Sequence, residues 1–195
     1  MNKLFTTAAL LCTLSLGFTS CSKDDDRVEE RKLNDATATT AVATIEVPAG
    51  AKVFYDFKTN STQEEAQSMI NLSETYGSTL QNSSPEHYKM GYFDQENTSV
   101  EKLTLSSILE AKIELTDKLG IDASSAGAPV KGPTWIIYDY KNNHAVYPTP
   151  NRYIVIYKGE KLSDKSDELY VIQAAEVTAL RGDATYNINF KKFIK

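Results

Sequence analysis

The chain has 195 residues, a formal net charge of −5 and 41% hydrophobic residues, enough for one domain with a core of its own. The acidic balance and the lack of a basic stripe exclude a nucleic-acid-binding protein. Both cysteines, Cys12 and Cys21, lie near the N-terminus, so we expect neither a disulfide nor a thiolate site in the folded domain. Eleven tyrosines against two histidines favour a ligand-contacting β surface over acid–base chemistry.

The N-terminal segment has the pattern of a secretory signal. Lys3 supplies a positive start, residues 4–16 are largely apolar, and the small residue Ser20 precedes Cys21. The apolar run is too short for a membrane span. The junction resembles the bacterial lipobox, in which the signal is cleaved before a cysteine that receives fatty acyl chains such as palmitate. The resemblance implies a signal peptide over residues 1–20 and a lipid anchor on Cys21; an ordinary secretory signal that ends at a cysteine is the alternative.

The next segment is polar. Residues 22–26, Ser-Lys-Asp-Asp-Asp, resemble the export tag that sends some Gram-negative lipoproteins to the outer face of the outer membrane. A solvated charge run on a periplasm-facing anchor is the alternative. Residues 27–44 contain no aromatic side chain and can bury too little surface to fold. We therefore expect a lipidated, disordered tether over residues 21–43 and a folded domain over residues 44–195.

The first half of this domain mixes strand and helix patterns. Short strands are expected at residues 44–47 and 53–57. A short helix is expected from residue 62 until Gly77 ends it, because Glu64 and Glu65 suit a first turn. Further along the chain, the pattern predicts a strand, a helix and a loop, at residues 87–93, 106–119 and 123–133 respectively.

The second half has the pattern of β structure throughout. Alternating apolar residues predict four strands, at residues 135–140, 152–157, 169–180 and 185–193. Polar turns at residues 158–160 and 181–183 favour antiparallel pairing of the last three. The sequence as a whole predicts an α+β, β-rich domain with a mostly antiparallel sheet and one or two short helices.

Three segments of this half resemble a known family. They are Trp-Ile-Ile-Tyr-Asp-Tyr at 135–140, Asn-Asn-His at 142–144 and Pro-Thr-Pro-Asn-Arg-Tyr-Ile-Val-Ile at 148–156. They are similar to the C-terminal core of the HmuY family of haem-binding surface lipoproteins, and the resemblance is strongest over residues 134–193. Two features depart from the family pattern: a Trp-Asp motif after the first strand is missing, and Tyr157-Lys158 replaces an Arg. The resemblance implies an HmuY-like fold that binds haem or a related tetrapyrrole and delivers it to an outer-membrane receptor.

The resemblance also implies a set of haem-binding residues. Iron would be the only metal and would be held through haem, with axial ligands drawn from Met90, His87, Tyr140 and His144, and with Met69 as a weaker choice. An ungapped alignment from Trp135 to Asn151 puts Tyr140 where the founding member has a ligand histidine. We expect Tyr140 and His144 on a rigid wall, and His87 and Met90 on a mobile loop that faces it. Other haem contacts would come from Trp135, Tyr138 and Arg152, with Lys131, Lys141 and Arg152 near the propionates.

Each of these residues also has an ordinary structural interpretation, as a packing tyrosine, a turn histidine or a core methionine. Enzyme motifs such as Gly-x-Ser-x-Gly, His-Glu-x-x-His and the Walker loop are absent from the sequence, so we expect no enzyme. The sequence thus predicts a lipid-anchored outer-membrane protein that faces the cell exterior and binds haem. A surface adhesion or assembly module on the same fold, without haem, is the alternative.

The lipobox gives a first testable prediction. Cys21→Ala removes the acylated thiol and should release the protein from the membrane fraction, because the signal peptide does not anchor the mature chain. Fractionation and labelling with a radioactive fatty acid would measure this. A variant that stays membrane-bound, or that still incorporates label, would contradict the lipid anchor.

Overall fold

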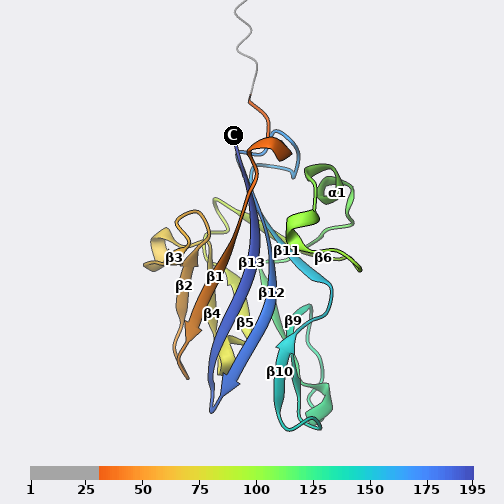
Figure 1. The fold of residues 1–195 in the computed structure, drawn as a ribbon. Coiled ribbons are helices and arrows are strands. Elements are labelled where there is room, and N and C mark those ends of the chain that lie inside the picture. Colours follow the sequence, from red (N-terminus) through yellow and green to blue (C-terminus); the bar gives the residue numbers. More distant parts are fainter. Residues whose placement is uncertain (1–30) are drawn as a thin grey trace, which may run out of the picture.

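Two β-sheets face each other in the computed structural model, which describes residues 31–195 (Figure 1). The predicted signal peptide, Cys21 and the charged segment at 22–26 lie outside the described residues. The first sheet has the order β1-β13-β12-β11-β6-β7, with β1 (Thr39–Val47), β6 (Lys89–Asp94), β7 (Glu114–Leu115), β11 (Arg152–Lys158), β12 (Glu168–Leu180) and β13 (Asp183–Ile194).

The second sheet has the order β10-β9-β8-β5-β4-β2-β3. Its strands are β2 (Val53–Asp56), β3 (Ser61–Thr62), β4 (Ile70–Ser73), β5 (Thr79–Asn82), β8 (Lys118–Asp122), β9 (Thr134–Asp139) and β10 (Ala145–Pro148). The pair β8–β9 is parallel and the other pairs are antiparallel. One α-helix, α1 (Leu105–Glu110), lies within the described part of the chain. The predicted β-rich α+β class is confirmed.

Two apolar clusters hold this arrangement, and β11 separates them. Ile154 and Ile156 of β11 point into the main core between the sheets. Tyr153, Val155 and Tyr157 point to the other face, where a second cluster is covered by α1, by the 3-10 turn η4 (Val100–Lys102), and by Leu33 and Ala38, which flank the 3-10 turn η1 (Asp35–Thr37). Because β11 is buried on both faces, its sequence is a continuous apolar run instead of an alternating one.

The predicted tether is wrong over its last ten or so residues, where the chain is folded. Leu33 is 2% exposed and its N–H donates to the carbonyl of Asp164 at 2.8 Å. β1 begins at Thr39 and pairs with β13 along its whole length, which buries Ala43. The sequence window lacks aromatic residues, but backbone pairing with a distant strand supplies the stability that its own side chains do not.

The helix predicted from residue 62 to Gly77 is also wrong. The segment forms β3, η2 (Glu65–Gln67), β4 and η3 (Thr75–Gly77), and β4 pairs with β5 as a hairpin. Ile70, Asn71 and Leu72 are all buried, so β4 shows no two-residue alternation. A strand that is buried on both faces cannot be told from a helix by periodicity alone.

Other predicted elements differ mainly in their ends. α1 covers only the start of the predicted helix at 106–119, because Thr104 and Ser107 cap its N-terminus and the chain is extended again from Ala111 to form β7 and β8. The predicted tight turn at 158–160 is wrong, because a longer connection joins β11 to β12. The predicted turn at Arg181-Gly182 is confirmed, and these two residues have φ of 53° and 98°. The strand β10 was not predicted. η5 (Ser124–Ala126) lies within the predicted loop at 123–133.

Gly91 gives a prediction about packing. A Cβ at this position of β6 would lie 2.8 Å from the Glu114 carbonyl oxygen and 2.8 Å from Cγ2 of Ile113. Gly91→Ala should therefore lower the free energy of unfolding by about 1–3 kcal/mol, since the backbone of β7 must move. Urea denaturation would measure it. Gly120→Ala is the matched control, because its nearest atom would be 3.9 Å away, and equal effects of the two changes would contradict the close contact.

Candidate functional site

The hairpin of β9 and β10 projects from one end of the sandwich and carries a cluster of aromatic side chains (Figure 1). The ring of His144 lies 4.8 Å from that of Tyr140, edge-on at 89°, and 5.9 Å from that of Tyr138. Tyr138 in turn stacks on Tyr76 of η3, with ring centroids 6.3 Å apart. We call Tyr76, Tyr138, Tyr140 and His144 the aromatic cluster. Tyr140 is 54% exposed and His144 is also exposed, so the cluster opens to solvent.

A tight turn places His144 in this cluster. Asn143 and His144 have φ of 52° and 60°, and the N–H of Ala145 donates to the carbonyl of Asn142 at 3.0 Å. Two successive left-handed residues are the mark of a type I′ turn, whose twist fits a hairpin. Asparagine and histidine tolerate this conformation better than most residues. As a result, the imidazole lies back over the strand, and its Nδ1 is 2.5 Å from Oη of Tyr138.

Tyr76 is held by the core. Its backbone is left-handed, with φ of 62°, and its N–H donates to the carbonyl of Gly182 at 2.9 Å. The Tyr186 hydroxyl donates to the carbonyl of Tyr76. Burial raises the pKa of Tyr186, so this hydroxyl stays a donor. Trp135 stacks on Tyr186 at 4.5 Å, which anchors the hydrogen bond in the interior.

Strained backbone is concentrated at this end of the molecule. Tyr76 and His144 of the aromatic cluster have positive φ, as do Glu74 and Arg181 in the neighbouring turns. Each such residue costs about 1 kcal/mol or more and persists only where the surrounding structure holds it. Strain of this kind is found preferentially at binding sites, which singles out the aromatic cluster among the exposed surfaces described.

A half-buried apolar wall lies beside the cluster. β10 lies against β12, and Val177 of β12 is paired with Tyr186, whose side chain points into the core. Ala174, Val177 and Ala179 therefore share the inner face of β12, and all three are half-buried against the main core together with Tyr76 and Tyr138. Small side chains on the wall and rings on the hairpin give a surface suited to a flat apolar ligand.

The predicted residues Met90, Met69 and Trp135 lie in the core instead. Met90 is 2% exposed on β6, opposite Ile156, so the expected mobile loop is wrong for this residue. Met69 is 1% exposed and Trp135 is 2% exposed, with its indole N–H donating to the carbonyl of Ser78 at 3.0 Å. Side chains packed this way are not available to a ligand.

His87 is exposed but lies far from the aromatic cluster. It follows Asn82 at the end of β5, which is bonded to Asp117 just before β8. β8 and β9 are parallel, so the turn that carries His144 lies at the other end of the sheet. The structure thus brings Tyr140 and His144 together with Tyr138 and excludes His87 from their site.

Arg152 is occupied by other contacts. Its guanidinium donates twice to the Asp94 carboxylate, at 2.8 Å each, and once to the carbonyl of Thr134. The hydrogen bonds to Asp94 raise the pKa of the Arg152 guanidinium. Tyr140 lies six residues beyond Thr134 on the hairpin, about 20 Å away at the rise of a strand. Lys131 and Lys141 are exposed, and Lys141 lies in the hairpin turn itself.

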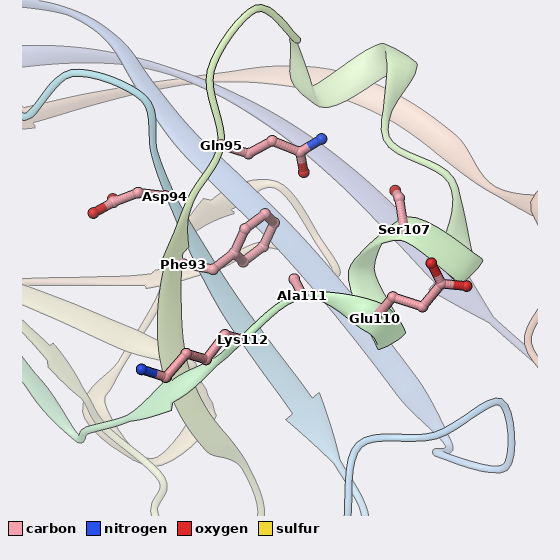
Figure 2. A pocket seen from close by; sticks show the side chains of 7 residues that line it. All are labelled: Phe93, Asp94, Gln95, Ser107, Glu110, Ala111 and Lys112. Carbon is pink, nitrogen blue, oxygen red and sulfur yellow. The ribbon is translucent and has the colours of Figure 1, made fainter.

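A second hollow lies beside α1, and three of its polar side chains are already bound. This groove of about 340 Å³ is drawn in Figure 2, between the end of β6 and the helix. Asp94 in its wall is paired with Arg152, Ser107 caps α1, and Glu110 accepts a hydrogen bond from Ser106 at 2.8 Å. The groove is therefore a weaker candidate for a ligand-binding site than the aromatic cluster.

Sequence reasoning did not find a buried carboxylate, Glu168 at the start of β12. Tyr170, Tyr88 and Lys58 donate to it, at 2.9, 3.1 and 2.6 Å respectively. Burial tends to raise the pKa of Glu168, but the hydrogen bonds from Lys58 and the two tyrosines outweigh it, and the pKa is lowered. These hydrogen bonds connect Lys58, which follows β2, and Tyr88, which precedes β6, to the start of β12, and their role is structural. Glu168 follows Asp167 in a polar segment, so the sequence carried no signal of its burial.

Comparison with known proteins identifies no relative: no protein-family model, curated protein or solved structure matches this chain. Within residues 31–195, no group of three or more His, Cys, Asp or Glu side chains is placed to hold a bare metal ion. No helix in that range is long and apolar enough to cross a membrane.

Glu168 gives a prediction about pH. Because its folded-state pKa is lowered, its ionised form stabilises the fold above the ordinary glutamate pKa, and this is lost as pH falls through the folded-state value. Glu168→Gln should lower the free energy of unfolding by about 1–3 kcal/mol at pH 7, and the difference should shrink below about pH 4. Urea denaturation at several pH values would measure it.

Glu176→Gln, exposed on the same strand, is the control and should have little effect at any pH. A Glu168→Gln difference of equal size at pH 3 and pH 7 would contradict the prediction.

Proposed function

We propose that the protein is an outer-membrane lipoprotein, anchored through Cys21 and exposed to the cell exterior, that binds haem or a related tetrapyrrole and delivers it to an outer-membrane receptor. The observation that supports this proposal most is the pairing of Tyr140 and His144, two exposed side chains in ring contact on a projecting hairpin. A phenolate and an imidazole are both donors that ferric haem iron accepts.

The residues around the pair fit the chemistry of haem. A macrocycle needs flat apolar surface, which Tyr138, Tyr76 and the small residues of β12 supply. Its propionates need cations near solvent, and Lys141 lies in the hairpin turn while Arg181 lies in the turn between β12 and β13. When bound, the haem would supply an iron that takes one donor from the hairpin.

The position of the site also supports surface delivery. Residue 31 and η1 lie at the same end of the sandwich as the C-terminus, whereas the β9–β10 hairpin lies at the opposite end (Figure 1). An anchor attached before residue 31 would therefore leave the aromatic cluster facing away from the membrane. A ligand at that end would be open to a donor outside the cell and to the parts of a receptor that extend beyond the membrane.

A hemin titration tests the proposal. The mature chain from residue 22 onward, which lacks the acylated cysteine, should give a saturable Soret change at one equivalent of hemin. Replacing both donors, His144→Ala with Tyr140→Phe, should weaken hemin affinity at least about tenfold, because an iron bond is worth more than 1.4 kcal/mol. Absorption spectroscopy would measure both results.

His87→Ala is the matched control, since His87 is an exposed histidine at the other end of the sheet, and it should leave the spectrum unchanged. A wild-type chain with no saturable Soret change would sink the haem proposal and favour the adhesion or assembly module. Loss of binding in His87→Ala alone would move the site away from the hairpin.

A further inference from the structure

We infer that Tyr138 is a positioning residue that holds Nδ1 of His144 and so presents Nε2 to the iron of a bound tetrapyrrole. This inference rests on the proposed function and adds the donor atom and the group that orients it. The direct observation is the distance of 2.5 Å between Oη of Tyr138 and Nδ1 of His144, within a contact of the two rings.

The hydrogen bond occupies Nδ1 and so leaves Nε2 as the nitrogen that could bind a metal. A neutral imidazole has one N–H and one lone pair, whereas a phenol hydroxyl can donate or accept. A nitrogen that binds iron must offer its lone pair, so the proton has to be on the other nitrogen. The contact between Nδ1 and Oη of Tyr138 accommodates either direction of donation, and an iron at Nε2 would select the tautomer in which Nδ1–H donates to Oη of Tyr138 and Nε2 keeps its lone pair.

Tyr138 is itself fixed, as a positioning group must be. Its carbonyl accepts a hydrogen bond from Oγ of Ser125 at 3.0 Å, and that Oγ accepts from the N–H of Tyr140 at 2.8 Å. The 3-10 turn η5 thus clamps the end of β9. The Tyr138 ring is half-buried and stacks on Tyr76, whereas the His144 ring is exposed. An anchored hydroxyl therefore orients a side chain that would otherwise be free to rotate.

Tyr140 contacts the same imidazole but cannot share the iron with it in this arrangement. The two rings are 4.8 Å apart and edge-on, so both side chains would approach a bound haem from the same side. Only one of the two side chains can then donate from the hairpin. His144 is the one whose donor atom is oriented by a hydrogen bond.

Two variants of the mature chain from residue 22 onward separate this role from a packing role. Tyr138→Phe keeps the ring and removes the hydroxyl, and it should weaken hemin affinity about tenfold and shift the Soret spectrum. Tyr147→Phe is the matched control, because Tyr147 pairs with Ile137 and lies on the other face of the hairpin. Both variants should keep the wild-type thermal midpoint, and Tyr147→Phe should keep the wild-type hemin spectrum.

Nitrogen-15 chemical shifts of the His144 ring give a second readout. In the ligand-free protein, Tyr138→Phe should change the Nδ1 shift, whereas Tyr147→Phe should not. Gallium protoporphyrin, a diamagnetic stand-in for hemin, should move the Nε2 resonance of the wild-type protein and leave a proton on Nδ1. This measurement needs no variant, so it tests the inference even if Tyr138→Phe does not fold.

Three results would overturn the inference. A Tyr138→Phe protein with wild-type hemin affinity and spectrum would remove the role of Tyr138 and leave the proposed function intact. A gallium complex in which Nδ1 of His144 is the bound nitrogen, or in which neither nitrogen moves, would remove the donor assignment. A wild-type protein that binds neither hemin nor gallium protoporphyrin would overturn the proposed function and this inference together.

Discussion

The stack of Trp135 on Tyr186 is the contact on which the rest of the structure depends. Trp135 belongs to the second sheet and Tyr186 to the first, and with 4.5 Å between their ring centroids they join the two sheets at the centre of the core. Each ring also reaches outward through one hydrogen bond, from the Trp135 indole to Ser78 and from the Tyr186 hydroxyl to Tyr76. The same pair therefore fixes the sheet packing and the strained turn that supports the aromatic cluster.

The two ends of the sandwich differ in their hydrogen bonds and in their exposure to solvent. At one end, the side chain of Lys191 donates to the carbonyls of Glu101 and Leu103, and the backbone of Leu33 is bonded to the loop before β12, so the entering chain is held firmly. At the other end, the turn with Asn143 and His144 is exposed, and both residues have positive φ. The hydrogen bonds described stabilise the end at which the described chain begins. The exposed aromatic side chains lie at the opposite end.

An open site suits a protein that passes its ligand on. Tyr140 and His144 are exposed, whereas Tyr76, Tyr138 and the wall of β12 are half-buried against the core. A ligand held by one donor and a flat apolar contact is bound through few groups, and most of its surface stays available to a second protein. The exposure of Tyr140 and His144 is compatible with the proposed delivery to a receptor.

The sequence by itself determined the β-rich class and the strands β9, β11, β12 and β13, because alternation in β13 and the Arg181-Gly182 turn are local signals. Tertiary structure alone decided that Met90 is core, that Tyr76 joins the aromatic cluster, and that residues 70–82 form a hairpin. These outcomes depend on strand pairing between distant segments and on burial of both faces of a strand. Neither leaves a periodic signal in the local sequence.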